Sequence, residues 1–586
     1  MGWLRRMWAA PLAMHAGLLA FVLVALIPVV GPGASFSPDE GVAVIQARTI
    51  QGDGGWIVEH PFAELDPGDD YYPLGASTVG RHGQAPFAKH PAYPVLLAGL
   101  DRAGGITAMV LLSIAGTVGA AVAAALLARR VAGGLERPVL WTVGLGSPLL
   151  FDAYLLIAHS LGAALAAGAV VAAAGGLQRG GARPFLLAAL ATAAAVLVRS
   201  EALVFAAALA AGIGLSAIAL RRPRLLAGAA AVAGAGLAAA LAEKQAQIAL
   251  VGASPGGVQA PAVEGGFLGA RMEAFINTWL DPSAGVTTSA DLALLLAVVL
   301  TVAGAVVARR RPERPGLLVA VVLVAGAVSV LAFADSPSRT VPGFLVAFPV
   351  AAVALALVDR RYFEAASGRL LVTVTAGLFV AAILATQYRE GGSAEWGGRY
   401  FALAIPLVSV LAVDALARRS PALPVGSRRW AAAGLVGVSA LLSVGAVTSL
   451  ARIHSFTGEL LERIAATGAT SQPGDGHSQP VLVSAYPNIP RLAWASFSDQ
   501  RWLHNPDPGA GAELAHRLRE AGVDELVFVG SEPDDVAPYL VAYRVDEDRS
   551  WEMGSWAVST LVPSETGGRA PVDSAGARLD RRSRRP

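Results

Sequence analysis

The sequence has no cysteine and almost no lysine, and each absence narrows the chemistry that the protein can perform. Without cysteine, the chain can form no disulfide, thiolate metal ligand or thiol nucleophile. Of the 45 basic residues only Lys89 and Lys244 are lysine, so arginine is the usual cation and each lysine needs a reason. Charged residues make up only 15% of the chain and the net charge is +2, which argues against nucleic acid as a partner.

What the chain has in excess is apolar sequence. Hydrophobic residues make up 54% of the 586 positions and the mean hydropathy is +0.55, which leaves too little charge to cover a soluble protein of this length. Apolar runs near the ~20 residues that a helix needs to cross a bilayer recur between residues 12 and 450. We predict about thirteen spans, at 12–31, 106–128, 138–152, 154–176, 184–198, 201–220, 225–250, 290–308, 315–334, 343–358, 370–388, 400–417 and 430–450.

Arginine in the connecting loops predicts the orientation of these spans. One alternating set of short loops holds 21 basic residues, whereas the opposite, longer set holds about ten up to residue 450. Basic short loops face the cytoplasm, so we expect a multi-pass protein of the plasma membrane with a cytoplasmic N-terminus. The first run has the length of a span and no cleavage site leading into a soluble domain, so we interpret it as uncleaved and not as a signal peptide. The long segments, including 32–105, and the C-terminal region are then extracytoplasmic.

The composition becomes that of a soluble module near residue 452. Buried strands on either side of an amphipathic helix predict a small extracytoplasmic α/β domain at 452–563. The tail at 564–586 is polar and rich in arginine, and we expect it to be disordered. The predicted elements are strands at 481–485, 525–529, 539–545 and 556–562 and a helix at 510–521.

The first predicted outer loop, 32–105, carries most of the candidate chemistry. Ser37 is a good helix N-cap, Pro38 suits the first helical position, and Glu40 completes a capping box three residues after the serine. We therefore expect a helix to begin here. The cap accounts for Glu40 but does not require Asp39, so the acidic pair is open to two interpretations, helix capping and catalysis.

Three motifs follow one another in this loop. The acidic pair Asp39-Glu40 comes first, then a glycine-rich turn ending in tryptophan at 52–56, then Lys89-His90-Pro91 before an apolar helix. In this order the loop resembles the polyprenyl-phosphate-sugar-dependent glycosyltransferases of the GT-C superfamily. It is most similar to the branch of the protein O-mannosyltransferases and the lipid A aminoarabinose transferase. The similarity is close over about 60 residues, and the rest of the chain matches only in general layout.

The resemblance implies a fold and two central roles. It implies an all-α, polytopic, GT-C-like membrane domain at 1–451 with a catalytic first outer loop. It also implies that Asp39 deprotonates the acceptor hydroxyl and that Lys89 binds the phosphate of the lipid carrier. Both roles suit the chemistry, because the attacking hydroxyl needs a base and the departing phosphate needs a cation. For Lys89 the alternative is interfacial snorkelling, which an arginine would serve equally well. We take Asp39 and Glu40 together as the candidate catalytic residues.

A bound metal is left open by departures from the family pattern. The aminoarabinose branch has a basic-aromatic pair directly after Asp-Glu, where this chain has Gly-Val. It also has an acidic residue before the lysine, where this chain has Ala88. We therefore assign no metal ligand and no certain cofactor, although His60, His82 and His90 with nearby carboxylates would suit a divalent ion.

Further candidates for substrate binding lie in and beyond the loop. Arg399 would give a second phosphate contact, with Trp396 or Tyr400 stacking on sugar or prenyl; the alternative is an interfacial aromatic belt. Arg199 lies beside Glu201 in an apolar hairpin and is either functional or half of a structural ion pair. The remaining candidates are His90, Tyr71 and Tyr72.

These features together predict an inverting glycosyltransferase. It would move a hexose or pentose from a polyprenyl-phosphate donor to an acceptor hydroxyl on the outer face, in a glycan, lipid or protein. The expected partners are the lipid-linked sugar, the acceptor and membrane lipids. A transporter or lipid flippase is the alternative, and it would place charges in mid-span and show inverted repeats. A third interpretation is a catalytically silent scaffold that presents the C-terminal domain.

Overall fold

The computed structural model divides into two compact units. The first comprises residues 1–56 and 87–457, and the second comprises 57–86 and 458–586. The division therefore falls inside the first predicted outer loop. The predicted domain limits at 451 and 563 stay predictions, and the tail expected to be disordered lies almost wholly outside the described residues. The described residues are 10–53, 55–74, 87, 90–251, 266–280, 289–311, 320, 324, 327, 343–364, 368–386, 396–469 and 480–564.

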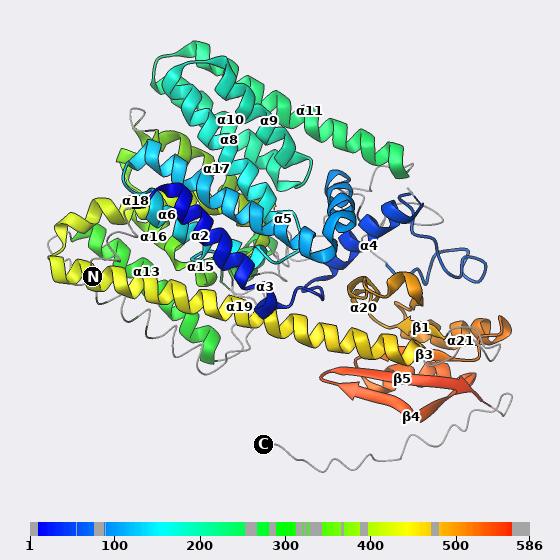
Figure 1. The fold of residues 1–586 in the computed structure, drawn as a ribbon. Coiled ribbons are helices and arrows are strands. Elements are labelled where there is room, and N and C mark those ends of the chain that lie inside the picture. Colours follow the sequence, from blue (N-terminus) through cyan, green and yellow to red (C-terminus); the bar gives the residue numbers. More distant parts are fainter. Residues whose placement is uncertain are drawn as a thin grey trace. The chain divides into compact units, whose positions relative to one another are not determined.

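The first unit is built of apolar helices (Figure 1). Within the described residues, eight helical segments are long and apolar enough to cross a bilayer. The chain is thus a multi-pass membrane protein, as predicted. The orientation and the total of about thirteen spans stay predictions, because most of 315–334 lies outside the described residues. The eight are α2 (Leu12–Ala25) with α3 (Ile27–Val30), α5 (Ala92–Ala132), α8 (His159–Arg179), α10 (Glu201–Ala219), η2 (Pro223–Leu225) with α11 (Leu226–Val251), α17 (Arg369–Thr386), η6 (Arg399–Ala404) with α18 (Ile405–Arg419), and α19 (Val425–Ala469).

Small residues allow these helices to pack closely. α5 packs against α8, α8 against α9 (Ala182–Val196), and both α9 and α10 against α11, which Figure 1 shows as one group. A Cβ added to Gly116 of α5 would lie 2.6 Å from the backbone nitrogen of Leu161 in α8. One added to Gly176 of α8 would lie 2.7 Å from the ring of Phe185 in α9. Such close approach gives the van der Waals packing that holds helices together in lipid.

Two predicted spans are not continuous helices. The span at 138–152 consists of α6 (Glu136–Gly144) and α7 (Leu149–Asp152), and the span at 343–358 consists of α15 (Phe344–Ala347) and α16 (Pro349–Leu357). The break ahead of α7 contains Pro148 and the break ahead of α16 is followed by Pro349; proline disfavours the helical conformation in the residue before it. Asp152 therefore lies at the end of a short helix and not within a span.

The predicted helix of the first outer loop is confirmed as α4 (Pro38–Asp53). The next helix, α5, is kinked at Gly104 and Gly105, and Gly105 has φ 62° and ψ −155°, a conformation that side chains disfavour. The predicted span at 106–128 begins directly after this kink. The remaining described elements of this unit are α12 (Gly266–Phe275), the π-helical η3 (Ile276–Leu280), α13 (Ser289–Arg310), η4 (Arg360–Phe363) and η7 (Ser420–Ala422).

The second unit is built around a five-stranded sheet. Its strand order is β2-β1-β3-β5-β4, with β1, β2 and β3 parallel and with β5 antiparallel to both β3 and β4. The predicted α/β domain is confirmed, with the helix at 510–521 found as α21. β2 was not predicted, and the strand predicted at 539–545 begins only at Tyr543. The elements are β1 (Val481–Ser484), α20 (Asn488–Leu492), η8 (Phe497–Asp499), β2 (Arg501–His504), η9 (Pro508–Ala510), α21 (Gly511–Glu520), β3 (Leu526–Gly530), η10 (Pro533–Val541), β4 (Tyr543–Met553) and β5 (Trp556–Pro563).

Residues 57–74 are part of this second unit. Phe62 and Tyr71 are buried in its core, together with side chains of β1, β2, β3 and α21. The backbone N–H of His504, in the edge strand β2, donates to the carbonyl of Tyr71 at 3.0 Å. The guanidinium of Arg501 lies 4.1 Å from the centre of the Phe62 ring. This segment therefore covers the free edge of β2, which would otherwise be open to pairing with another chain.

Candidate active site

Glu40 fixes the start of α4. Its Oε2 accepts hydrogen bonds from the backbone N–H groups of Phe36, at 2.8 Å, and Ser37, at 2.9 Å. Its Oε1 accepts from the N–H of Leu156, in the turn after α7, at 2.8 Å. The carboxylate is 1% exposed, and these three donors account for its burial. Half of the predicted capping box thus forms, while the Ser37 hydroxyl is buried without a hydrogen-bond partner among the described residues.

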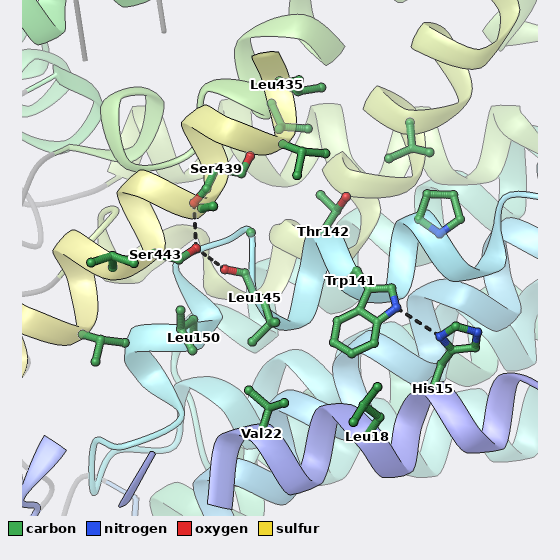
Figure 2. A pocket seen from close by; sticks show the side chains of 18 of the residues that line it. His15, Leu18, Val22, Trp141, Thr142, Leu145, Leu150, Leu435, Ser439 and Ser443 are labelled. Carbon is green, nitrogen blue, oxygen red and sulfur yellow. Dashed lines mark hydrogen bonds between the residues drawn. The ribbon is translucent and has the colours of Figure 1, made fainter. Parts of the chain in front are cut away.

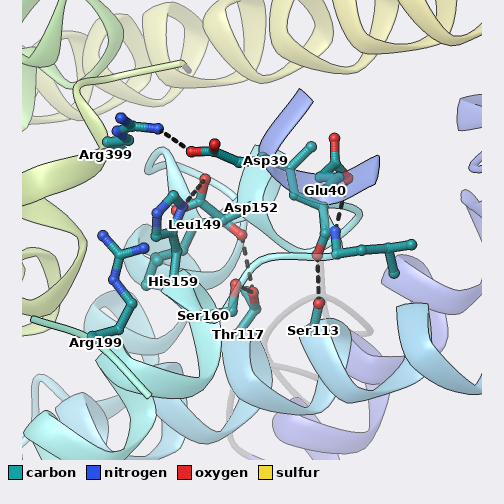
Figure 3. Close-up of polar contacts among 12 residues, drawn as sticks. Asp39, Glu40, Ser113, Thr117, Leu149, Asp152, His159, Ser160, Arg199 and Arg399 are labelled. Carbon is teal, nitrogen blue, oxygen red and sulfur yellow. Dashed lines mark hydrogen bonds and ion pairs between the residues drawn. The ribbon is translucent and has the colours of Figure 1, made fainter. Parts of the chain in front are cut away.

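Asp39, the neighbouring residue, faces a different group. Its Oδ2 lies 2.9 Å from a terminal nitrogen of Arg399, which is 360 positions away in the sequence. Both side chains stay about one quarter exposed, at 28% for Asp39 and 26% for Arg399, so both are accessible; Figure 3 shows their contact. The structure therefore brings together two residues that the sequence analysis proposed separately.

Two glycines place Arg399 at this position. Gly397 and Gly398 have φ of 80° and 69°, in the left-handed region that side chains disfavour. A Cβ on Gly397 would lie 2.2 Å from Pro148, and one on Gly398 would lie 2.9 Å from the carbonyl of Thr278. Only residues without a side chain fit here, because the backbone passes so close to Pro148 and Thr278 before η6 begins.

A buried acid and a histidine, neither of them predicted, lie next to this pair. The side chains of Asp152 and His159 are 3% and 1% exposed, and Oδ1 of the acid is 3.8 Å from Nδ1 of the ring. Figure 3 shows both between Arg399 and Arg199. These ionisable residues lie within apolar runs, a signal that commonly marks function and that the sequence analysis applied only to Arg199.

Hydroxyl groups of α5 hold the turn that carries Asp152 and His159. Thr117 donates to the carbonyl of Leu149 at 2.9 Å and hydrogen-bonds the hydroxyl of Ser160 at 2.9 Å. Ser113 donates to the carbonyl of Leu155 at 2.6 Å. Together with Glu40, these bonds satisfy the irregular backbone of a segment that has little regular hydrogen bonding of its own.

Arg199 forms an ion pair with Glu201. This pairing is one of the two interpretations predicted for Arg199 from the sequence. A terminal nitrogen of the guanidinium is 2.6 Å from Oε1 of the acid, and each side chain is 12% exposed. The stem of Arg199 packs against α8 at Gly162, where a Cβ would lie 3.1 Å from its Cγ. Glu201 is also within electrostatic range of His159 and His90. The pair is therefore continuous with the Asp152–His159 group, and its functional role stays a prediction.

His90 also has partners within the first unit. Its Nδ1 is 2.6 Å from Oε1 of Glu243 in α11, and its Nε2 is 3.0 Å from the hydroxyl of Ser200. The side chain is buried, at 5% exposure. Lys89, the predicted phosphate ligand, and His82 lie outside the described residues.

The predicted aromatic residues fall into two groups. Trp396 is buried against Phe151, with parallel rings 5.9 Å apart, and Tyr400 lies beneath the guanidinium of Arg399. Of the two, Tyr400 is the one shown in contact with a member of the Asp39–Arg399 pair. Tyr71 and Tyr72 belong instead to the second unit, where Tyr71 is in the core and the Tyr72 hydroxyl donates to the carbonyl of Val58 at 2.8 Å. Their predicted roles in substrate binding stay predictions.

The described residues hold no group of three or more histidine, aspartate or glutamate side chains arranged for a metal ion. His60, one of the histidines considered, hydrogen-bonds Asp66 at 2.8 Å through Nε2 and accepts from the N–H of Phe62 through Nδ1. Both ring nitrogens are thus engaged within the second unit.

An apolar groove with a volume of about 1120 Å³ lies in the first unit between α2, α6, α18 and α19. Figure 2 shows Leu18 and Val22 of α2 facing Leu435 and Ser439 of α19 across it. Two of its polar side chains are hydrogen-bonded: Trp141 donates to Nδ1 of His15 at 3.2 Å, and Ser443 donates to the carbonyl of Leu145. Leu150 also lines the groove, and the next residue, Phe151, is the one that stacks on Trp396. Adjacent residues of α7 thus contact the groove and Trp396.

No protein-family model and no curated protein matches the sequence. Among solved structures, the oligosaccharyltransferase of Archaeoglobus fulgidus in the apo form is similar at a TM-score of 0.51 and 13% identity. The match covers 90% of this chain and 70% of the other. The chain has the GT-C fold. The resemblance predicted from the sequence is confirmed to that extent.

A second similar structure is that of ArnT from Cupriavidus metallidurans bound to undecaprenyl phosphate. The TM-score is 0.48 at 12% identity, and the match covers 97% of this chain and 99% of ArnT.

Proposed function

We propose that this protein is an inverting glycosyltransferase that transfers a sugar from a polyprenyl-phosphate donor to an acceptor hydroxyl at the extracytoplasmic face. The observation that carries the proposal is the pairing of Asp39 with Arg399, both of them accessible, within a GT-C fold. A carboxylate and a guanidinium side by side are the two groups that displacement at a sugar phosphate requires.

The proposed reaction is a single displacement. The acceptor oxygen attacks the anomeric carbon while Asp39 takes its proton, and the bond from that carbon to the phosphate oxygen breaks. Arg399 stabilises the charge that grows on the departing phosphate, and Lys89 is proposed to act with it. Because attack and departure occur on opposite faces of the sugar, the anomeric configuration inverts.

Glu40 and the Asp152–His159 group support this reaction in different ways. Glu40 accepts three backbone N–H groups, so we assign it the placing of Asp39 and not a contact with substrate. Asp152 and His159 are buried next to Arg399 and Arg199. We assign them the orientation of these arginines toward the phosphate, because a nearby carboxylate restricts the positions that a guanidinium can take.

The isoprenoid chain of the donor needs an apolar path that ends at the phosphate site. The groove between α2, α6, α18 and α19 meets this need, because it is lined almost wholly by apolar side chains and reaches Leu150. Substituting Ser439, on its wall, with tryptophan would reduce the usable volume (Figure 2). We expect this change to raise KM for a long-chain donor more than for a donor with a short isoprenoid tail.

The test is to incubate the purified full-length protein with polyprenyl-phosphate hexoses and pentoses and to separate the lipid-linked sugars on thin layers. Loss of one donor together with appearance of a glycosylated acceptor or free sugar supports the proposal. Nuclear magnetic resonance of the product then gives the anomeric configuration. Retained configuration would contradict the single displacement, and an unchanged pool of all donors would contradict the function itself.

The transporter alternative gains no support from the buried ion pairs of the described residues. The clearest pair outside the site joins Arg369 to Asp414, with the two groups 2.8 Å apart. Arg369 is the first residue of α17, and Arg418 shares the same acid near the end of α18. This cluster therefore lies at helix ends and links helices, whereas a transport pathway would place its charges in mid-span.

A further inference from the structure

His90, Ser200 and Glu243 form a second cluster of reactive side chains, which the proposed sugar transfer does not require. They come from the turn before α5, the residue before α10, and the C-terminal half of α11. The carboxylate of Glu243 is 2.6 Å from Nδ1 of His90, and the hydroxyl of Ser200 is 3.0 Å from Nε2. The three groups thus form a continuous line from acid to imidazole to hydroxyl.

The order of atoms in this line is that of an activated serine. A carboxylate can only accept, so Nδ1 of His90 carries the proton and Nε2 is left to accept from the hydroxyl of Ser200. The base is oriented by the acid and is 5% exposed, whereas Ser200 is exposed. A nucleophile within hydrogen-bond reach of a base that a third group orients is the diagnostic arrangement for nucleophilic catalysis.

The position of Ser200 in the fold favours the same chemistry. Ser200 is the N-cap residue of α10. The first turn of a helix presents backbone N–H groups and the positive end of the helix dipole. The N–H groups of Ala202 and Leu203 already donate to the carbonyls of Arg199 and Ser200, each at 3.2 Å. The helix end would therefore act on an oxyanion formed at Ser200 through its potential and not through free donors.

The surroundings of the cluster indicate the class of substrate. Leu203 follows Ser200 by one helical turn and is an exposed large apolar residue. Lys244, one of the two lysines of the chain, directly follows Glu243 and is exposed. An ester with an acyl chain and an anionic head group would match this combination of apolar surface and single cation.

We propose that Ser200, His90 and Glu243 form a second catalytic site, which hydrolyses a carboxylic ester of an anionic membrane lipid. The oxygen of Ser200 forms a bond with the acyl carbon while its proton passes to Nε2 of His90. The bond between the acyl carbon and the alcohol oxygen breaks, and the alcohol leaves with that proton. Water then attacks the acyl-serine, giving the free acid and restoring the serine. Glu243 stabilises the imidazolium in both steps.

The test uses the purified full-length protein in detergent with an alkyl fluorophosphonate, which reacts with activated serines. We expect labelling at Ser200, located by mass spectrometry of the peptides, and no labelling after heat denaturation. Ser200→Ala should abolish it. Glu243→Gln should slow it by at least about 100-fold, because an amide cannot stabilise the imidazolium. Ser420→Ala, which removes a serine of the first unit in η7, is the matched control and should react like the unaltered protein.

Hydrolysis of 4-nitrophenyl esters gives a second readout, with faster turnover expected for longer acyl chains. An unlabelled Ser200 in the native protein would overturn the proposal. So would labelling of the Glu243→Gln or His90→Gln variant at the unaltered rate, because the serine would then not be activated by the relay. Sugar transfer is measured in the same preparations, so that failure of this site is distinguished from failure of the glycosyltransferase.

Discussion

Residues 38–53 and 57–74 are neighbours in one polar loop, yet their acidic and aromatic side chains have different partners. In the first segment, Asp39 reaches Arg399 and Glu40 reaches the turn after α7, both far away in the sequence. In the second, Asp66 accepts from the N–H groups of Asp70 and Tyr71 and hydrogen-bonds His60, all within a few positions. Asp39 and Glu40 are thus bound to distant parts of the chain, whereas Asp66 is bound within its own segment.

The difference shows that burial of an acid and its use in chemistry need separate evidence. Glu40 and Asp66 are both almost fully buried, and both have backbone donors that account for their burial. Asp39 is more exposed and has a cation at its open side. Of these three carboxylates, only Asp39 combines access with a charged partner, as a general base next to a phosphate requires.

The largest expected effect comes from exchanging one acid in each segment for its amide. We expect Asp39→Asn to lower the rate of sugar transfer by about 1000-fold with an unfolding temperature close to that of the unaltered protein, because the amide cannot accept the proton. Asp66→Asn should instead destabilise the second unit, since an amide satisfies its two N–H donors and His60 less well. Initial rates and thermal unfolding in detergent separate the two. Equal loss of rate and of stability in both variants would remove the distinction between the segments.

Glu40→Ala tests the positioning role within the first segment. It leaves three buried N–H donors without a partner, so we expect a loss of stability of about 3–5 kcal/mol. The remaining folded protein should show a lower kcat through misplacement of Asp39. Glu40→Gln, which keeps one acceptor oxygen, is the matched control and should recover part of the stability. Full activity and stability in Glu40→Ala would show that α4 is held by other contacts.

The sequence allowed the local features to be predicted, whereas the contacts between distant segments left no local trace. The N-terminal end of α4 follows from Ser37-Pro38 and Glu40, and strand β3 follows from a run of apolar residues. By contrast, Asp39 and Arg399 are separated by 360 positions and His90 and Glu243 by 153, so only the fold brings each pair together.

Two omissions have clear physical causes. β2 has only four residues, and its sequence Arg-Trp-Leu-His shows no alternation because both faces are packed, with Trp502 in one core cluster and Leu503 in another. Asp152 is the last residue of the apolar run at 138–152, and nothing in that run predicts a contact with His159. The break ahead of α7 places the acid at a helix end, next to His159.

Removing an aromatic side chain from residues 57–74 tests whether this segment packs in the second unit. Phe62→Ala deletes a buried ring and its contact with Arg501, and we expect a loss of about 3 kcal/mol. Hydrogen exchange in the full-length protein should show faster exchange in β1 and β2, with helices of the first unit unchanged. Phe363→Ala, at a ring that is 56% exposed, is the control. Unchanged protection of β2 would contradict the packing of 57–74 on this strand.

Lowering the pH should reduce the stability of the second unit. Burial, assisted by the positive charge of Arg491, lowers the pKa of His504 from 6.5 to about 4. The unfolded chain therefore takes up a proton near pH 6.5 and the folded chain only near pH 4, so stability falls as the pH drops through this range. Hydrogen exchange of β2 at pH 7 and pH 5 measures the effect. His504→Gln should remove this part of the pH dependence, and an unchanged profile in that variant would assign it to another group.

The smallest expected effect concerns Tyr72, whose predicted role was substrate binding. Its hydroxyl donates to the carbonyl of Val58, and its ring meets that of His60 edge to face. Tyr72→Phe removes one buried hydrogen bond and should cost about 1 kcal/mol of stability. A structural tyrosine would lower the unfolding temperature and leave the ratio of KM to kcat for sugar transfer unchanged. If KM rises at full stability, the hydroxyl contacts substrate, and the second segment then takes part in the site together with the first.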